Sequence, residues 1–222
     1  MIKGVIFDLD GTILDSMHIW KQLPGIYLNR MGVQTEGNLS DAMSSMSMEE
    51  GAEFLKDQYL PEMDVEEIRS GILCTIEHFY DRHVQLKSGA DQFLQDVKNA
   101  GIRMVAATSS DRRIVERTLI KLGVIRYFEK IFTSTEIGVG KEKPDIYFIA
   151  SEFMGTPPKD TWVFEDALHA TLTAKKAGFK TVGVFDASSI KDWEKIKRNS
   201  DIYLKELDNF DAFLKETSFK WE

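Results

Sequence analysis

Short apolar runs recur through the second half of the chain, and each is followed by a segment whose apolar residues fall at helical spacing. An apolar run of this length that ends in polar residues is typical of a strand buried on both faces. One further run of this kind opens the chain. The predicted strands are residues 5–7, 102–107, 130–133, 161–164, 181–185 and 202–204. Because strands and helices alternate, we predict an α/β fold with a parallel sheet and right-handed crossovers.

Between the first strand and the second, the hydrophobic pattern is helical throughout. Asp64 and Glu67 match the capping box that begins a helix, and apolar residues follow at helical spacing. Pro24 predicts a kink or a restart in the first helix of this block. We therefore predict an all-α domain inserted into the α/β fold. The expected domains are a discontinuous core, residues 1–15 and 88–222, and a helical cap, residues 16–87.

The stretch Asp8-Leu9-Asp10-Gly11-Thr12 closes the first strand with two acids and a glycine. Carboxylates two residues apart at the mouth of a buried strand repel each other, and a divalent metal bound by oxygen ligands relieves that repulsion. Gly11 allows the chain to turn steeply, and Thr12 adds a hydroxyl beside the acids. Taken alone, the stretch is equally typical of a strand followed by an Asp-Gly turn, so its meaning depends on the rest of the chain.

Other predicted strands also end in polar residues. In parallel sheets, ligands bind at the edge formed by the carboxyl ends of the strands. These residues are Thr108, Ser109 and Ser110 after one strand, Glu165 and Asp166 after a later one, and Lys141 or Lys143 in a loop that leads into a helix. Together with the first motif they provide what phosphoryl transfer through a carboxylate requires.

In this mechanism Asp8 attacks phosphorus, while Asp10 serves as the general acid and then as the base that activates water. A magnesium ion held by Asp8, Asp166 and, as a further candidate, Glu165 keeps the nucleophile ionised. Thr108 and Ser109 are predicted to hydrogen-bond the phosphoryl group, and a lysine stabilises its negative charge. No Cys, His or Ser nucleophile is required.

Four ordered elements resemble the motifs of the haloacid dehalogenase superfamily. They are Asp8 to Thr12, Thr108 after a strand, Lys141 ahead of Pro144-Asp145, and Phe164-Glu165-Asp166. The resemblance spans the whole chain and implies a Rossmann-like core, a helical cap of the first class, magnesium dependence and an aspartyl-phosphate on Asp8. It also implies that Asp10 gives its backbone carbonyl to the metal. Counting back from Pro144-Asp145 selects Lys141 over Lys143. Ala167 and Ala170 stand where many members carry serine and glycine.

Within the superfamily, Thr12 favours a phosphatase, because it resembles the threonine that is thought to position the acid/base of those members. The β-phosphoglucomutases are the alternative, but they typically carry valine at this place, with a histidine and an arginine where this chain has Trp20 and Met48. Asp10 argues against a true dehalogenase, which lacks a second acid. A third hypothesis is a non-catalytic binding or regulatory member of the fold, which the complete set of motif residues disfavours.

The composition indicates which partners and which cellular compartment to expect. The chain has 222 residues, a net charge of −8 and a single cysteine, Cys74. An acidic chain is a poor general nucleic-acid binder, no run is long enough to span a membrane, and no intrachain disulfide can form. We expect a cytoplasmic protein, with a monomer as the default, whose partner is a small phosphorylated metabolite. Cys74 lies in a helical apolar pattern, so we predict that it is buried.

Two features of the predicted cap each have two interpretations. The Met- and Ser-rich stretch at residues 40–48 is equally typical of a loop that lines the substrate and of a surface turn. His18 follows the expected hinge, where packing or solvent exposure is favoured over a contact with substrate.

Overall fold

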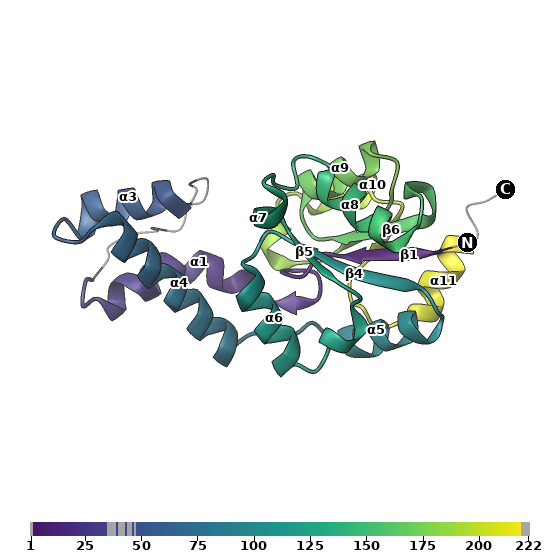
Figure 1. The fold of residues 1–222 in the computed structure, drawn as a ribbon, viewed down its shortest axis with the longest axis horizontal. Coiled ribbons are helices and arrows are strands. Elements are labelled where there is room, and N and C mark those ends of the chain that lie inside the picture. Colours follow the sequence, from purple (N-terminus) through teal and green to yellow (C-terminus); the bar gives the residue numbers. More distant parts are fainter. Residues whose placement is uncertain (1, 35–38, 40–42, 44–45, 47, 219–222) are drawn as a thin grey trace. The chain divides into compact units, whose positions relative to one another are not determined.

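The computed structural model describes residues 2–34, 39, 43, 46 and 48–218 (Figure 1). Contacts between residues divide the chain into two compact units. The first contains Met1–Asp15 and Gln85–Glu222, and the second contains Ser16–Val84. No helix in the described ranges is both long enough and apolar enough to span a bilayer.

The first unit is built on a six-stranded sheet whose strands follow the order β5-β4-β1-β6-β7-β8. All neighbouring strands are parallel, which confirms the predicted α/β fold. The strands are β1 (Gly4–Phe7), β4 (Arg103–Thr108), β5 (Ile131–Thr133), β6 (Thr161–Glu165), β7 (Lys180–Val184) and β8 (Ile202–Leu204). Because β1 lies between β4 and β6, the polar residues that follow these three strands share one edge of the sheet.

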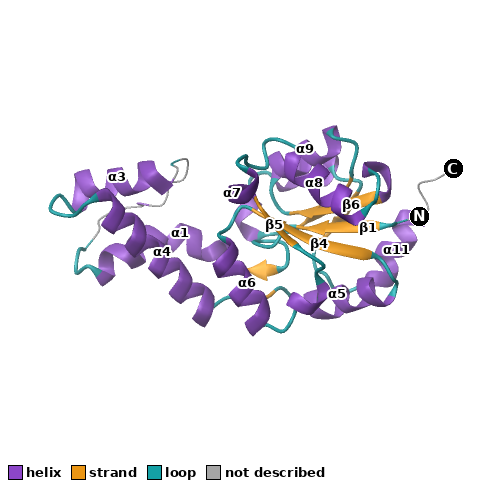
Figure 2. Ribbon diagram, viewed as in Figure 1, coloured by secondary structure: helices purple, strands orange, loops and turns teal. Residues whose placement is uncertain are grey.

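Helices cover both faces of this sheet (Figure 2). On one face, α8 (Asp145–Met154) and α9 (Leu168–Lys176) pack over Ile6 and Val163. On the other face, α5 (Ala90–Asn99) and α11 (Phe210–Ser218) enclose an aromatic cluster. Its members are Phe7, Phe93, Phe164 and Phe213. Successive strand residues therefore enter opposite cores, which is why the strands read as continuous apolar runs.

Three further helices and three 3₁₀ turns complete the described part of the first unit. They are α6 (Arg112–Lys121), α7 (Ser134–Ile137), α10 (Trp193–Asn199) and the 3₁₀ turns η1 (Ile125–Tyr127), η2 (Pro158–Asp160) and η3 (Ala187–Ser189). The carboxylate of Asp111 accepts the backbone N–H of Arg113 at 2.9 Å, which caps α6 as the sequence indicated. The short α7 and the 3₁₀ turns were not predicted, because a single turn carries no periodicity.

Two short strands were also missed by the sequence pattern. β2 (Leu14–Asp15) pairs antiparallel with β3 (Gln85–Leu86), and both belong to the first unit. Each strand has two residues, and the paired residues lie about seventy positions apart in the chain. A local sequence pattern therefore cannot predict the pairing. The pair joins the turn after β1 to the segment that leads into α5.

The described part of the second unit consists of α1 (Met17–Arg30), α3 (Met48–Tyr59) and α4 (Val65–Arg82). The backbone N–H of Asp64 donates to the Glu67 carboxylate at 3.2 Å, and this capping box confirms the predicted start of α4. The predicted restart at Pro24 is wrong, because α1 continues through it. Packing of buried α1 residues such as Leu23 and Leu28 outweighs the one helical hydrogen bond that proline lacks.

Two other expectations concern this unit. Cys74 is exposed on α4, so its predicted burial is wrong; the apolar stripe of α4 passes through Ile72 and Ile76 instead. The ring of exposed His18 packs against Phe79, with 5.1 Å between ring centroids, in agreement with a packing role. Most of the stretch at residues 40–48 lies outside the described residues.

Candidate active site

A tight turn follows β1 and separates the two acids of the first motif. The backbone N–H of Asp8 still donates to Phe164 of β6, at 3.0 Å. The chain then folds back, and the Leu9 carbonyl accepts the N–H groups of Ile13 and Leu14 at 2.9 and 2.7 Å. Gly11 has φ 86°, a left-handed conformation that glycine adopts without strain. Asp8 thus extends the strand, while Asp10 belongs to the turn.

Three carboxylates meet at the carboxyl edge of β1 and β6. One oxygen each of Asp8, Glu165 and Asp166 lies within 4.8 Å of the others, and all three residues are buried. Glu165 is the last residue of β6, and the other two residues directly follow β1 and β6. The pairing of these strands therefore creates the cluster, because it aligns Phe7 with Phe164.

Lys141 contributes the positive charge of this cluster. Its side chain is 5% exposed, and its Nζ donates to Asp8 Oδ1 and to Glu165 Oε1, the latter at 2.7 Å. Lys143 is exposed, so the structure brings to the cluster the lysine that the motif spacing selected. The hydroxyl of Tyr147 on α8 donates to the same Glu165 oxygen at 2.8 Å. Glu165 is therefore held by two donors.

Burial and the repulsion of neighbouring carboxylates raise the pKa values of Asp8 and Asp166. Burial raises the pKa of Asp8 to about 7, with Lys141 opposing the rise and the charges of Glu165 and Asp10 adding to it. Burial, followed by the charges of Asp8 and Glu165, also raises the pKa of Asp166. Burial disfavours the ammonium of Lys141, but the neighbouring carboxylates outweigh it and raise its pKa. One lysine thus leaves three carboxylates incompletely neutralised.

The chemistry of the cluster fits a divalent metal with oxygen ligands. Asp8 Oδ2 is buried and has no hydrogen-bond partner among the described residues. Asp166 and Glu165 each present a carboxylate oxygen within 4.8 Å of one from Asp8. Oxygen ligands of this kind are the ones that magnesium prefers. A cation there would supply the missing neutralisation and a partner for the orphaned oxygen. Asp8 and Asp166 are the ligands least committed elsewhere, because Glu165 already accepts from Lys141 and Tyr147.

The loop after β4 reaches Asp10 rather than the carboxylate cluster. Ser110 Oγ donates to Asp10 Oδ2 at 2.7 Å, and the backbone N–H of Ser110 donates to Thr108 Oγ1 at 3.0 Å. Thr108 is buried at the end of β4. The hydroxyl of Ser109 is exposed and lies 3.3 Å from that of Ser134. The sequence did not predict the contact between Ser110 and Asp10. Residues 108–110 all carry hydroxyl groups, and a sequence pattern does not show which of the three faces Asp10.

Thr12 is fully buried, and its Oγ1 has no hydrogen-bond partner within the described part of the chain. Its supporting role stays a prediction. Two other polar residues near the motifs point to surface roles: Arg112 pairs with Glu136 of α7, and exposed His169 lies 3.9 Å from Glu142.

Comparison with known proteins identifies the family. The sequence profile described as "Haloacid dehalogenase-like hydrolase" matches residues 5–184, which include Asp8, Thr108, Lys141 and Asp166. The chain belongs to this family. This match confirms the resemblance inferred from the four motifs. Relatives of the chain are named as phosphatases, which supports its assignment to the phosphoric monoester hydrolases.

Two curated relatives cover most of the haloacid dehalogenase-like chain. The Bacillus subtilis protein named "Putative phosphatase YhcW" is 29% identical over 82% of this chain and 83% of its own length. The fructose-1-phosphate phosphatase YqaB of Escherichia coli is 28% identical over 82% of this chain and 95% of its own. Among solved structures, a Thermotoga maritima protein described as "putative beta-phosphoglucomutase" aligns with a TM-score of 0.81 over 97% of this chain and 99% of its own, at 22% identity. That alignment confirms the fold.

Proposed function

We propose that this haloacid dehalogenase-like hydrolase is a magnesium-dependent phosphatase that cleaves a small phosphomonoester through an aspartyl-phosphate on Asp8. The observation that carries the proposal is the buried cluster of Asp8, Glu165 and Asp166 with Lys141 at the carboxyl edge of the sheet. Lys141 keeps the Asp8 carboxylate in place, and Asp8 Oδ2 has no hydrogen-bond partner among the residues that the structure describes. This arrangement suits nucleophilic attack on phosphorus. The two compact units would serve as the catalytic core and the cap.

In this mechanism, a carboxylate oxygen of Asp8 attacks phosphorus in line with the leaving oxygen. Lys141 holds Asp8 in place and stabilises the charge on the phosphoryl oxygens. Thr108 and Ser109 after β4 donate hydroxyl hydrogen bonds to the same oxygens. Asp8, Asp166 and the Asp10 carbonyl, with Glu165 as a further candidate, would hold a magnesium ion. The ion would supply charge neutralisation for the nucleophile and the transferring group.

Asp10 transfers the proton. As the leaving oxygen departs, the Asp10 carboxyl group protonates it, and the resulting carboxylate then removes a proton from the water that hydrolyses the aspartyl-phosphate. Ser110 donates to Asp10 Oδ2 and thereby orients the carboxyl group for this transfer. Gly11 supports this arrangement by allowing the turn that carries Asp10, and Thr12 fills the buried side of the turn.

The names of the relatives support a sugar phosphate or a similar metabolite as the substrate. One relative is a fructose-1-phosphate phosphatase, and another, from Thermotoga maritima, is named "Phosphorylated carbohydrates phosphatase" and is 23% identical. The mutase alternative is retained because the fold alone does not separate the two activities: the solved structure that shares it is described as a "putative beta-phosphoglucomutase". A mutase would convert β-glucose 1-phosphate to glucose 6-phosphate without net release of phosphate.

Phosphate release from a panel of phosphomonoesters tests the proposal. Purified protein with magnesium is expected to release inorganic phosphate from at least one sugar phosphate, and chelation with EDTA is expected to lower that rate by about 1,000-fold. Restoring magnesium should restore the rate. Isomerisation without release would favour the mutase. No turnover on any substrate would favour the non-catalytic hypothesis and overturn the proposal.

Replacing Ser110 with alanine tests the acid/base role of Asp10. We expect kcat for an alkyl phosphate to fall by about 10-fold, because Asp10 loses the donor that orients it. The fall should be much smaller for p-nitrophenyl phosphate, whose leaving group needs no proton. Ser109→Ala is the matched variant and should mainly raise KM, since its proposed role is in binding. An equal loss on both substrates in Ser110→Ala would contradict acid/base orientation.

A further inference from the structure

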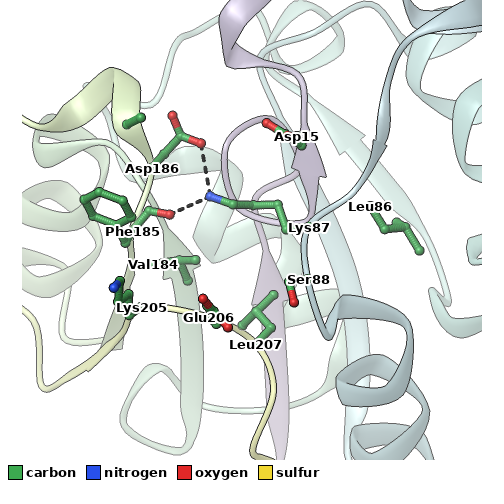
Figure 3. A pocket seen from close by; sticks show the side chains of 11 residues that line it. Asp15, Leu86, Lys87, Ser88, Val184, Phe185, Asp186, Lys205, Glu206 and Leu207 are labelled. Atoms are coloured by element: carbon green, nitrogen blue, oxygen red, sulfur yellow. Dashed lines mark hydrogen bonds and ion pairs between the residues drawn. The ribbon is translucent and has the colours of Figure 1, made fainter.

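Lys87, which directly follows β3, makes contacts that the proposed chemistry does not use. Its Nζ donates to the carbonyls of Gly11 and Phe185 at 2.6 and 2.5 Å and to Asp186 Oδ2 at 3.0 Å. Lys87 lines a cavity of about 250 Å³. Figure 3 shows its side chain extending to Phe185 and Asp186, which follow β7. The three protons of the ammonium thus have three acceptors, so the group is fully used inside the protein.

The environment of Lys87 is more buried than that of an ordinary surface ion pair. The side chains of Lys87 and Asp186 are 17% and 8% exposed. Asp186 is itself fixed, because its Oδ1 accepts the N–H and the hydroxyl of Ser188 at 2.8 and 2.6 Å. An anchored and poorly solvated carboxylate holds its partner far more firmly than an exposed one does.

Lys87 binds the turn at residues 9–14 at two points. Its ammonium holds the Gly11 carbonyl, and its backbone N–H donates to the Ile13 carbonyl at 2.9 Å. The Gly11 carbonyl lies in the peptide plane that joins Gly11 to Thr12, and Gly11 alone links this plane to the peptide that follows Asp10. Holding the carbonyl therefore restrains the backbone directly after Asp10. The turn has no side-chain donor of its own on the Gly11 carbonyl among the contacts that the structure describes; that bond comes from 76 residues away.

We propose that Lys87, anchored by Asp186, is a positioning residue that clamps the turn at residues 9–14 and thereby holds Asp10 in the geometry for proton transfer. The proposal rests on the proposed function and extends it to a residue outside the four motifs. Lys87 connects the segments that follow β1, β3 and β7. The positions of these distant segments therefore determine where the Asp10 carboxylate lies. Small displacements of such a group have large kinetic effects.

Lys87→Met, which keeps the apolar stem and removes the ammonium, tests the clamp. We expect kcat to fall by about 10- to 100-fold with KM little changed, and Lys87→Arg to recover part of the loss. Lys205→Met is the matched control, because Lys205 lines the same cavity and is exposed. Its kcat should equal that of the wild type. A Lys87→Met enzyme with the kcat of Lys205→Met would overturn the proposal.

A double variant separates positioning from stability. Lys87→Met leaves the Asp186 carboxylate buried and unpaired, which by itself destabilises the fold. Adding Asp186→Asn removes that charge and should restore stability, while the Gly11 carbonyl still lacks its donor, so kcat should stay low. Recovery of kcat together with stability would show that Lys87 is only structural, and it would refute the clamp.

Hydrogen exchange gives a readout that does not depend on activity. The amides of Gly11, Ile13 and Leu14 are hydrogen-bonded within the turn. We expect them to exchange faster in Lys87→Met and in the double variant than in Lys205→Met. Unchanged exchange would overturn the clamp even if kcat fell. A wild type that hydrolyses no phosphomonoester would instead overturn the proposed function, and the exchange rates would still decide whether Lys87 holds the turn.

Discussion

Asp8→Asn is expected to abolish phosphate release, with a loss of about 10,000-fold or more in kcat. The amide has no charge and is a poor nucleophile, so the aspartyl-phosphate cannot form. Asparagine has the same shape as aspartate and leaves β1 and its hydrogen bond to Phe164 intact. The variant should therefore fold like the wild type, and its circular dichroism spectrum and cooperative thermal transition check this.

Acid-quenched mass spectrometry gives the positive counterpart of this result. In the wild type during turnover, we expect a phosphoryl adduct on the peptide that contains Asp8, and none in Asp8→Asn. Asp10→Asn supplies a contrast, because its loss of the acid/base should slow both steps while leaving the nucleophile in place. Phosphate release at a wild-type rate by Asp8→Asn, in protein shown by mass to be free of deamidation, would refute the mechanism.

Lys141→Met is expected to remove both activity and stability. Lys141 is the only cation that the structure describes in contact with Asp8 and Glu165, and its loss leaves buried acids without a partner. Removing one partner of a buried ion pair costs about 3–5 kcal/mol in the free energy of unfolding. Activity should fall by about 1,000-fold, because the nucleophile is no longer held and the transferring group loses its cation.

Lys143→Met is the matched control for this prediction. Lys143 lies two residues away, is exposed, and should tolerate the same change with normal stability and kcat. Chemical denaturation in EDTA and phosphate-release assays with magnesium measure the two effects. Added magnesium should restore part of the stability of Lys141→Met, since the metal neutralises the same acids. If Lys141→Met were as stable and as active as Lys143→Met, the assignment of the motif lysine would be wrong.

Most of the sheet was predictable because each strand carries a local signal. Residues 202–204 form β8 with the predicted bounds, and the other strands differ from the predictions by about one residue at an end. The start of α4 was equally local, since Asp64 and Glu67 form a capping box on their own. Pro24 and Cys74 show where this logic fails. In both cases the packing of the helix, rather than the residue's own tendency, determines the outcome.

The sequence by itself determined the chemistry that is available: two acids after the first strand, hydroxyls after another, a lysine before a helix and an acidic pair after a later strand. Spacing within each short motif carries that information because strand ends and turns are local. The tertiary structure alone decided which of these groups meet and which residues support them. It brought Tyr147 to Glu165, Ser110 to Asp10 and Lys87 to Gly11. These contacts join residues far apart in the chain through the pairing of strands, and no local pattern records which side chain will face which.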